Sequence, residues 1–143
     1  MNGQSILVVD DEQEFVATLV RRLRKRGLAC DGVLDGNAAL ALLASRAYDL
    51  VLLDMRLPDL DGVTVLCEIK KIRPQTQVII LTGHASIRDG EEGMRQGAFD
   101  YLLKPVEFET LLEKLHAATE QIPYRFLHKT ETVDAVPNTQ QTF

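Results

Sequence analysis

Five short apolar runs divide this chain of 143 residues, and four of them lead directly into a polar residue. The residues that follow these runs are the pair Asp10 and Asp11, then Asp54, Thr82 and Lys104. In an open parallel sheet the carboxyl ends of the strands share one edge, where they border a single crevice. The pattern therefore predicts that three carboxylates, a hydroxyl and an ammonium group meet there.

Segments with helical spacing of apolar residues separate the apolar runs. The strands are expected at 6–9, 28–33, 50–53, 78–81 and 99–103, and the helices at 12–27, 36–46, 63–72, 86–97 and from 108 onward. Strands and helices that alternate in this way favour right-handed parallel crossovers. The predicted fold class is α/β, a five-stranded parallel sheet with helices on both faces in a doubly wound, flavodoxin-like arrangement.

The helix expected at 86–97 contains Gly90 and Gly93. A glycine inside a helix costs about 1 kcal/mol relative to alanine. We therefore expect this helix to be the most mobile of the five.

The composition is that of a single ordinary domain, with 45% hydrophobic and 26% charged residues. We expect this domain to occupy residues 1–121. Residues 122–143 have little helical period and many polar residues, which predicts a partly disordered tail or linker.

A net charge of -5 argues against direct binding of nucleic acid, because such binding normally needs a clustered basic face. The basic run at 21–26 is interpreted as a solvated helix face. Cys30 and Cys67 fit neither a disulfide framework nor a zinc site and are expected to be reduced. The sequence has neither a signal-type segment nor an apolar run that could span a bilayer, which favours the cytoplasm.

The three aspartates suit a hard cation such as Mg²⁺, which binds through a few carboxylates and keeps several waters. A cation would also relieve the mutual repulsion of acids that lie close together. Two simpler interpretations stay open, since Asp11 could cap the following helix and Asp54 could be a turn residue.

With a cation to shield its charge, the Asp54 carboxylate could attack phosphorus and become an acyl phosphate. Phosphoryl transfer needs in-line positioning and neutralisation of the phosphoryl oxygens. Lys104 could supply a positive charge and Thr82 a hydroxyl, while Gly83 leaves room for the incoming group. Taken singly, Thr82 and Lys104 are ordinary strand-end residues, and only their joint placement favours a site.

The chain resembles the receiver domains of bacterial two-component response regulators. The matching segments are VVDDE at 8–12, DLVLLDMRLPDLDG at 49–62, LTGHAS at 81–86 and GAFDYLLKP at 97–105. The resemblance covers about residues 5–121. It implies a phosphorylation switch in which Asp54 is the phosphoacceptor, and Mg²⁺ is held by Asp10, Asp11, Asp54 and the backbone carbonyl of Arg56.

The same resemblance implies that Thr82 and Lys104 contact the phosphoryl group and that Tyr101 changes orientation together with Thr82. Pro105 lies where the family has a cis peptide bond. Arg56 and His84, each two residues from a site residue, are hypothesised to border the path of attacking water and to modulate the lifetime of the aspartyl phosphate.

The expected role is that of a signalling switch, not a classical enzyme. Its expected partners are a sensor histidine kinase or phosphotransfer protein and an unknown downstream protein, with a phosphorylation-dependent homodimer as a further hypothesis. The main alternative is a degenerate receiver that serves only as a protein-binding scaffold. A haloacid-dehalogenase phosphatase is disfavoured because Arg56 stands where those enzymes have a second acid, and a flavodoxin-like electron carrier is disfavoured by the acidic segment at 10–14.

Overall fold

The computed structural model describes residues 4–83 and 87–120, in which five strands alternate with five helices. The elements are β1 (Ser5–Val9), α1 (Gln13–Lys25), β2 (Ala29–Val33), α2 (Gly36–Ser45), β3 (Leu50–Asp54), α3 (Gly62–Ile72), β4 (Gln77–Thr82), α4 (Ile87–Arg95), β5 (Asp100–Leu103) and α5 (Phe108–Thr119). The predicted α/β fold class is therefore confirmed. His84 and the predicted tail at 122–143 lie outside the described residues.

All strand pairs in the sheet are parallel, and the strand order is β2-β1-β3-β4-β5. After β2 the chain crosses back over β1 and continues on its other side. In such sheets a binding crevice forms at the carboxyl ends of the two strands that flank this reversal, here β1 and β3. Asp10 follows β1 and Asp54 ends β3, so the topology alone brings them to this crevice.

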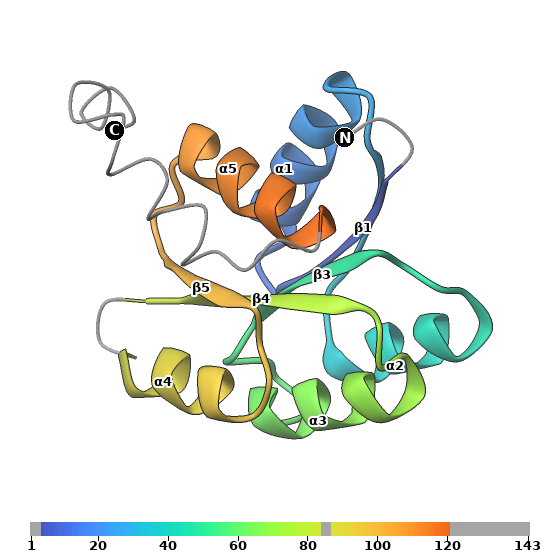
Figure 1. Ribbon diagram of the computed structural model, residues 1–143, viewed down its shortest axis with the longest axis vertical. Coiled ribbons are helices and arrows are strands. Elements are labelled where there is room, and N and C mark those ends of the chain that lie inside the picture. Colours follow the sequence, from blue (N-terminus) through green and yellow to red (C-terminus); the bar gives the residue numbers. More distant parts are fainter. Residues whose placement is uncertain (1–3, 84–86, 121–143) are drawn as a thin grey trace.

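Helices cover both faces of the sheet, as Figure 1 shows, with α1 and α5 on one face and α2, α3 and α4 on the other. Along β1, Ile6 and Val8 pack toward α1 and α5, whereas Leu7 and Val9 pack toward α2 and α3. A strand that is covered on both faces has no solvent-facing positions. This explains why the central strands are continuous apolar runs in the sequence.

The basic run at the end of α1 is exposed, as predicted for a solvated face, but some of its side chains also contact other elements. Arg21 and Lys25 are exposed, as expected. The Arg22 guanidinium, however, lies 4.0 Å from the centre of the Phe108 ring, and Arg24 Nε donates a hydrogen bond of 2.8 Å to a carbonyl of β2. These long side chains therefore connect α1 to α5 and to the edge strand, while their charged ends stay partly hydrated.

The glycines of α4 allow the helix to lie very close to the sheet. A Cβ atom on Gly90 would lie 2.9 Å from the Tyr101 ring, and one on Gly93 would lie 2.8 Å from the Ile80 side chain. Both distances are too short for a real contact. The two glycines thus have a packing role that the sequence did not reveal, and the expected mobility of α4 stays a prediction.

Both cysteines are free thiols, and Cys30 is buried in the core. Burial raises the pKa of Cys30 to about 12, so its unreactive thiol form predominates at neutral pH. Within residues 4–83 and 87–120, no helix has the length and apolar character needed to cross a membrane.

Candidate functional site

The first acid of the site, Asp10, is fully buried at the end of β1. Its Oδ1 accepts a hydrogen bond of 2.9 Å from the backbone N–H of Glu12, the residue immediately before α1. Asp11 is exposed beside it. Asp10 therefore makes the side-chain contact just before α1. The structure does not support the alternative interpretation of Asp11 as the cap of this helix.

The second strand of the crevice contributes Asp54, whose exposed fraction is only 7%. One carboxylate oxygen from each of Asp10, Asp11 and Asp54 lies within 4.8 Å of the others. Burial, and next the negative charge of Asp10, raise the pKa of Asp54 from 3.8 to about 6. The backbone N–H of Arg56 opposes this shift by donating a 3.2 Å hydrogen bond to Asp54 Oδ1.

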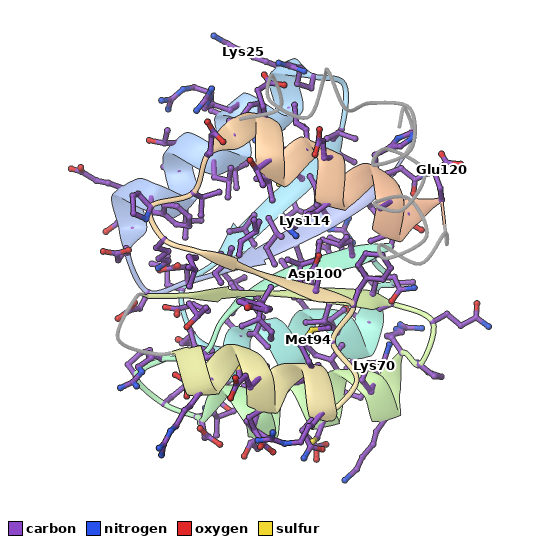
Figure 2. The ribbon with its side chains drawn as sticks, turned by 60° about the vertical axis from the view of Figure 1, so that its left-hand side comes forward. Lys25, Lys70, Met94, Asp100, Lys114 and Glu120 are labelled. Carbon is purple, nitrogen blue, oxygen red and sulfur yellow. The ribbon has the colours of Figure 1, made fainter. Side chains whose placement is uncertain are left out.

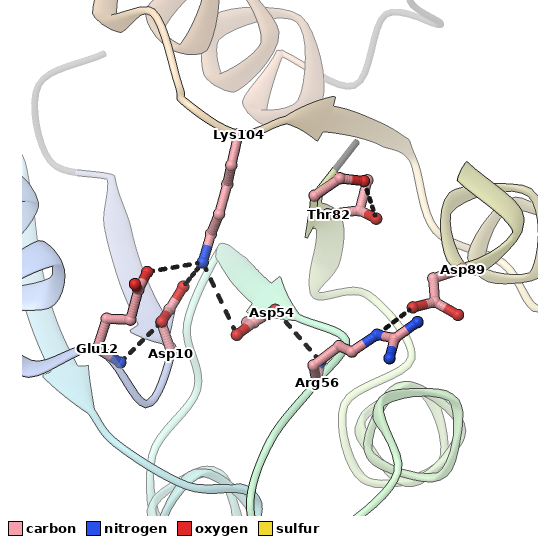
Figure 3. Close-up of polar contacts among 8 residues, drawn as sticks. Asp10, Glu12, Asp54, Arg56, Thr82, Asp89 and Lys104 are labelled. Carbon is pink, nitrogen blue, oxygen red and sulfur yellow. Dashed lines mark hydrogen bonds and ion pairs between the residues drawn. The ribbon is translucent and has the colours of Figure 1, made fainter. Parts of the chain in front are cut away.

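Lys104 brings a positive charge into this acidic cluster from the end of β5. Its Nζ lies 2.6 Å from Asp10 Oδ2, 3.2 Å from Glu12 Oε1 and 3.8 Å from Asp54 Oδ2, as Figure 3 shows. Burial alone would lower the pKa of Lys104, but the hydrogen bond and charge of Asp10 outweigh it and the pKa is raised. The Lys104–Pro105 peptide bond is cis.

The donor set fits a hard divalent cation. Three carboxylates supply only oxygen ligands, the kind that Mg²⁺ prefers, and one of them is exposed, so that bound water could complete the shell. Burial, and next the negative charge of Asp10, raise the pKa of Asp54 although Lys104 is close, and a bound cation would favour the ionised carboxylate. The cluster could therefore hold a metal ion, and the Arg56 carbonyl as a further ligand stays a prediction.

The loop that follows Asp54 is held at its far end. The carboxylate of Asp59 accepts hydrogen bonds from the backbone N–H groups of Gly36 and Asn37, at 2.9 and 2.8 Å. These groups begin α2, where the helix dipole favours a negative charge. The hydrogen bond from Asn37, ahead of the other causes, lowers the pKa of Asp59.

The other two predicted site residues lie at the ends of the next strands. Thr82 is almost fully buried at the end of β4, and its hydroxyl donates a 3.4 Å hydrogen bond to the Gly83 carbonyl. Leu81 pairs with Asp54 in β3 and Thr82 pairs with Leu103 in β5, so Thr82 lies on the strand next to the acidic cluster. Tyr101 is partly buried and packs against α4 through Gly90.

Two polar residues near the site were missed from the sequence. Glu12 contacts Lys104 from the start of α1, and Asp89 in the first turn of α4 forms an ion pair with Arg56. The acidic segment at 10–14 is evident in the sequence, but no sequence pattern links Glu12 to Lys104. No sequence signal connects Asp89 with Arg56, because the two are 33 positions apart.

Asp54→Asn is expected to stabilise the metal-free chain by about 1–2 kcal/mol, because it removes one of three clustered carboxylates. The raised pKa of Asp54 alone would imply a larger gain in the free energy of unfolding. The expected gain is smaller because Lys104 also loses a nearby negative charge. Urea unfolding without Mg²⁺ measures the change. Glu91→Gln, at an exposed acid of α4, is the control and should change stability by less than about 0.5 kcal/mol. An Asn variant less stable than the parent would contradict the expectation.

A doubly wound parallel sheet with three clustered acids and a lysine at its crevice is suited to phosphoryl transfer onto a carboxylate. The comparison with family models is specific: the response regulator receiver domain matches residues 6–116. The chain belongs to this family, and the resemblance noted from its motifs is confirmed.

Individual relatives agree with this assignment. Over 123 residues the chain is 37% identical to the transcriptional regulatory protein TcrA of Mycobacterium tuberculosis, which covers 86% of this chain and 49% of TcrA. It is 40% identical over 104 residues to the DNA-binding transcriptional regulator NtrC of Salmonella typhimurium, covering 73% of this chain and 22% of NtrC. The chain thus spans half or less of the length of these relatives.

Among solved structures, the receiver domain of NtrX from Brucella abortus superimposes with a TM-score of 0.77 at 36% identity. The match covers 80% of this chain and 98% of that structure. The described fold is therefore a complete receiver fold, and the general function of such domains is that of a phosphorylation switch in two-component systems.

Proposed function

We propose that this domain is a switch that accepts a phosphoryl group on Asp54 from a sensor histidine kinase or a phosphotransfer protein. The observation that carries the proposal is the cluster of three carboxylates at the ends of β1 and β3, with Lys104 Nζ 3.8 Å from Asp54 Oδ2. This arrangement would supply a nucleophile, ligands for a cation and a positive charge within one crevice. The proposed receiver domain comprises residues 1–121. It would act in the cytoplasm together with a partner of this kind.

In the proposed reaction a carboxylate oxygen of Asp54 attacks the phosphorus of the donor. The new P–O bond forms as the bond to the leaving group breaks, and the leaving group departs with the electron pair. Mg²⁺ bound by Asp10, Asp11, Asp54 and the Arg56 carbonyl would supply charge neutralisation for the phosphoryl oxygens. The ammonium group of Lys104, which now donates a hydrogen bond to Asp10, would also contact a phosphoryl oxygen.

The switch would act through Thr82 and Tyr101. A phosphoryl group on Asp54 offers strong acceptor oxygens to the Thr82 hydroxyl, which now donates a long hydrogen bond of 3.4 Å to the Gly83 carbonyl. Movement of Thr82 would change the space available to Tyr101, which packs against Gly90 of α4. The output would be a changed affinity for a downstream protein or for a second copy of the domain, without direct binding of nucleic acid by this chain.

The lifetime of the aspartyl phosphate would be set by residues that border the path of attacking water. Arg56 and His84 are proposed for this role from their positions in the sequence. Arg56 is exposed at the start of the loop after β3, beside Asp54. His84 lies outside the described residues.

Incubation with acetyl phosphate and Mg²⁺ is expected to add the mass of one phosphoryl group to the native chain and none to the Asp54→Asn variant. Omission of Mg²⁺ should reduce labelling at least tenfold, since the transferred group then lacks its main neutralising charge. Intact-mass spectrometry gives the result directly. Asp61→Asn, at an exposed acid of the same loop, is the matched control and should be labelled as fully as the native chain.

Two outcomes would count against the proposal. A native chain that is not labelled by acetyl phosphate or by a phosphorylated phosphotransfer protein would favour the alternative of a phosphorylation-independent scaffold. Equal labelling of the native chain and the Asp54→Asn variant would show that another residue is the acceptor.

A further inference from the structure

An ion pair links the loop after β3 to the first turn of α4. Arg56 Nε lies 3.1 Å from Asp89 Oδ2, in a geometry that is also a hydrogen bond. The two residues are 33 positions apart in the sequence, and the helix of Asp89 packs on the sheet beside Tyr101. Figure 3 shows the Arg56 side chain extended toward Asp89 and away from Asp54.

Arg56 contacts two parts of the switch with different groups. Its backbone N–H donates a hydrogen bond to Asp54 Oδ1, and its guanidinium is bound to α4 through Asp89. The main chain of Arg56 is therefore fixed beside the proposed phosphoacceptor. Its side chain needs only rotations about its own bonds to leave Asp89 and approach a group on Asp54.

Arg56 can readily leave Asp89 for another negatively charged partner. The side chains of Arg56 and Asp89 are 68% and 31% exposed, so water and salt weaken their attraction. A phosphoryl group carries more negative charge than a single carboxylate and presents oxygens that suit the planar guanidinium. Once Asp54 is phosphorylated, Asp89 would have to compete with the phosphoryl group for Arg56.

We infer that Asp89 is a positioning residue for Arg56, which holds the guanidinium on α4 and away from the face of Asp54 where water attacks the phosphoryl group. This inference rests on the proposed phosphorylation of Asp54. In hydrolysis a water oxygen bonds to phosphorus as the P–O bond to Asp54 breaks, which releases inorganic phosphate and restores the carboxylate. A guanidinium released from Asp89 covers the phosphoryl group, offsets its charge and slows this step.

The test compares the decay of aspartyl phosphate in variants labelled with acetyl phosphate and then freed of it. Asp89→Asn is expected to lengthen the half-life about two- to fivefold, the range open to an exposed ion pair. The same substitution in an Arg56→Ala background should change the half-life by less than about 1.5-fold. Asp89 acts only through Arg56 in this proposal, so the effects of the two substitutions should not add. Asp89→Glu keeps the carboxylate and should restore the native decay.

The matched control is Glu92→Gln, which removes an equal charge from α4 but breaks an ion pair with Arg95 instead. Its half-life should equal that of the native chain. A second readout needs no phosphorylation: exchange of the hydrogen-bonded amides of α4 that follow its first turn should rise equally in Asp89→Asn, Arg56→Ala and the double variant.

The outcomes separate the inference from the function on which it rests. Labelled variants that all decay at the native rate, or an Asp89→Asn effect that persists in the Arg56→Ala background, would overturn the positioning role and leave the proposed function intact. A native chain that takes up no phosphoryl group would overturn both.

Discussion

Lys114→Ala is expected to lower the free energy of unfolding by about 3–5 kcal/mol, because it leaves the buried carboxylate of Asp100 without its ammonium partner. Lys114 Nζ lies 2.6 Å from Asp100 Oδ2, and both residues are less than 10% exposed. Figure 2 shows the pair between α5 and β5, within the layer where that helix covers the sheet. Urea unfolding followed by circular dichroism measures the loss.

Two further variants separate the charge effect from simple loss of packing. Replacing both partners, as in Asp100→Leu with Lys114→Met, should restore stability to within about 2 kcal/mol of the native chain, since no unpaired charge is then buried. Lys71→Ala, which removes an exposed lysine paired with Glu68, should cost less than about 1 kcal/mol. A loss below about 1 kcal/mol for Lys114→Ala itself would show that Asp100 finds another partner or water.

Gly62→Ala is expected to destabilise the fold by about 2–4 kcal/mol, since a methyl group at this position has no space. Its Cβ would lie 2.5 Å from Met55 Cα and 2.7 Å from the Met55 carbonyl oxygen. These are backbone atoms, which cannot rotate away as a side chain could. Gly62 N also donates a 3.2 Å hydrogen bond to the same carbonyl, so the loop would have to open.

Gly83→Ala is the matched control, because a Cβ at Gly83 would meet no atom within 4 Å. This substitution should change the unfolding midpoint little. The Gly62 variant should also bind Mg²⁺ more weakly, since Met55 directly follows Asp54 in the site. Equal stability of the two glycine variants would contradict the steric argument.

The sequence predicted the sheet well because its strongest signal depends only on local burial. Central strands covered on both faces must be apolar throughout, and polar residues that follow them must come to one edge. Asp10, Asp54 and Lys104 could therefore be placed together before the structure was known. The strand order followed only from the predicted flavodoxin-like arrangement, because neighbouring strands leave no distinct pattern in a single sequence.

Side-chain contacts between distant elements were beyond the sequence for a related reason. Lys114 lies between apolar positions of α5 and resembles any surface lysine until Asp100 is seen opposite. Gly90 and Gly93 predicted a mobile helix, and the sequence did not reveal that their missing side chains also let α4 lie close to the sheet. In each case the partner, and not the residue itself, decides the role.

The loop after Asp54 is anchored unequally on its two sides. Toward α2 and α3 it is fixed by backbone contacts, through Asp59 on the first amides of α2 and through Gly62 against Met55. Toward α4, within residues 4–83 and 87–120, it is held by a solvated pair of charges, Arg56 with Asp89. Substitutions on the first side should therefore change the stability of the fold. Those on the second side should change how long the phosphorylated state lasts after the signal has ended.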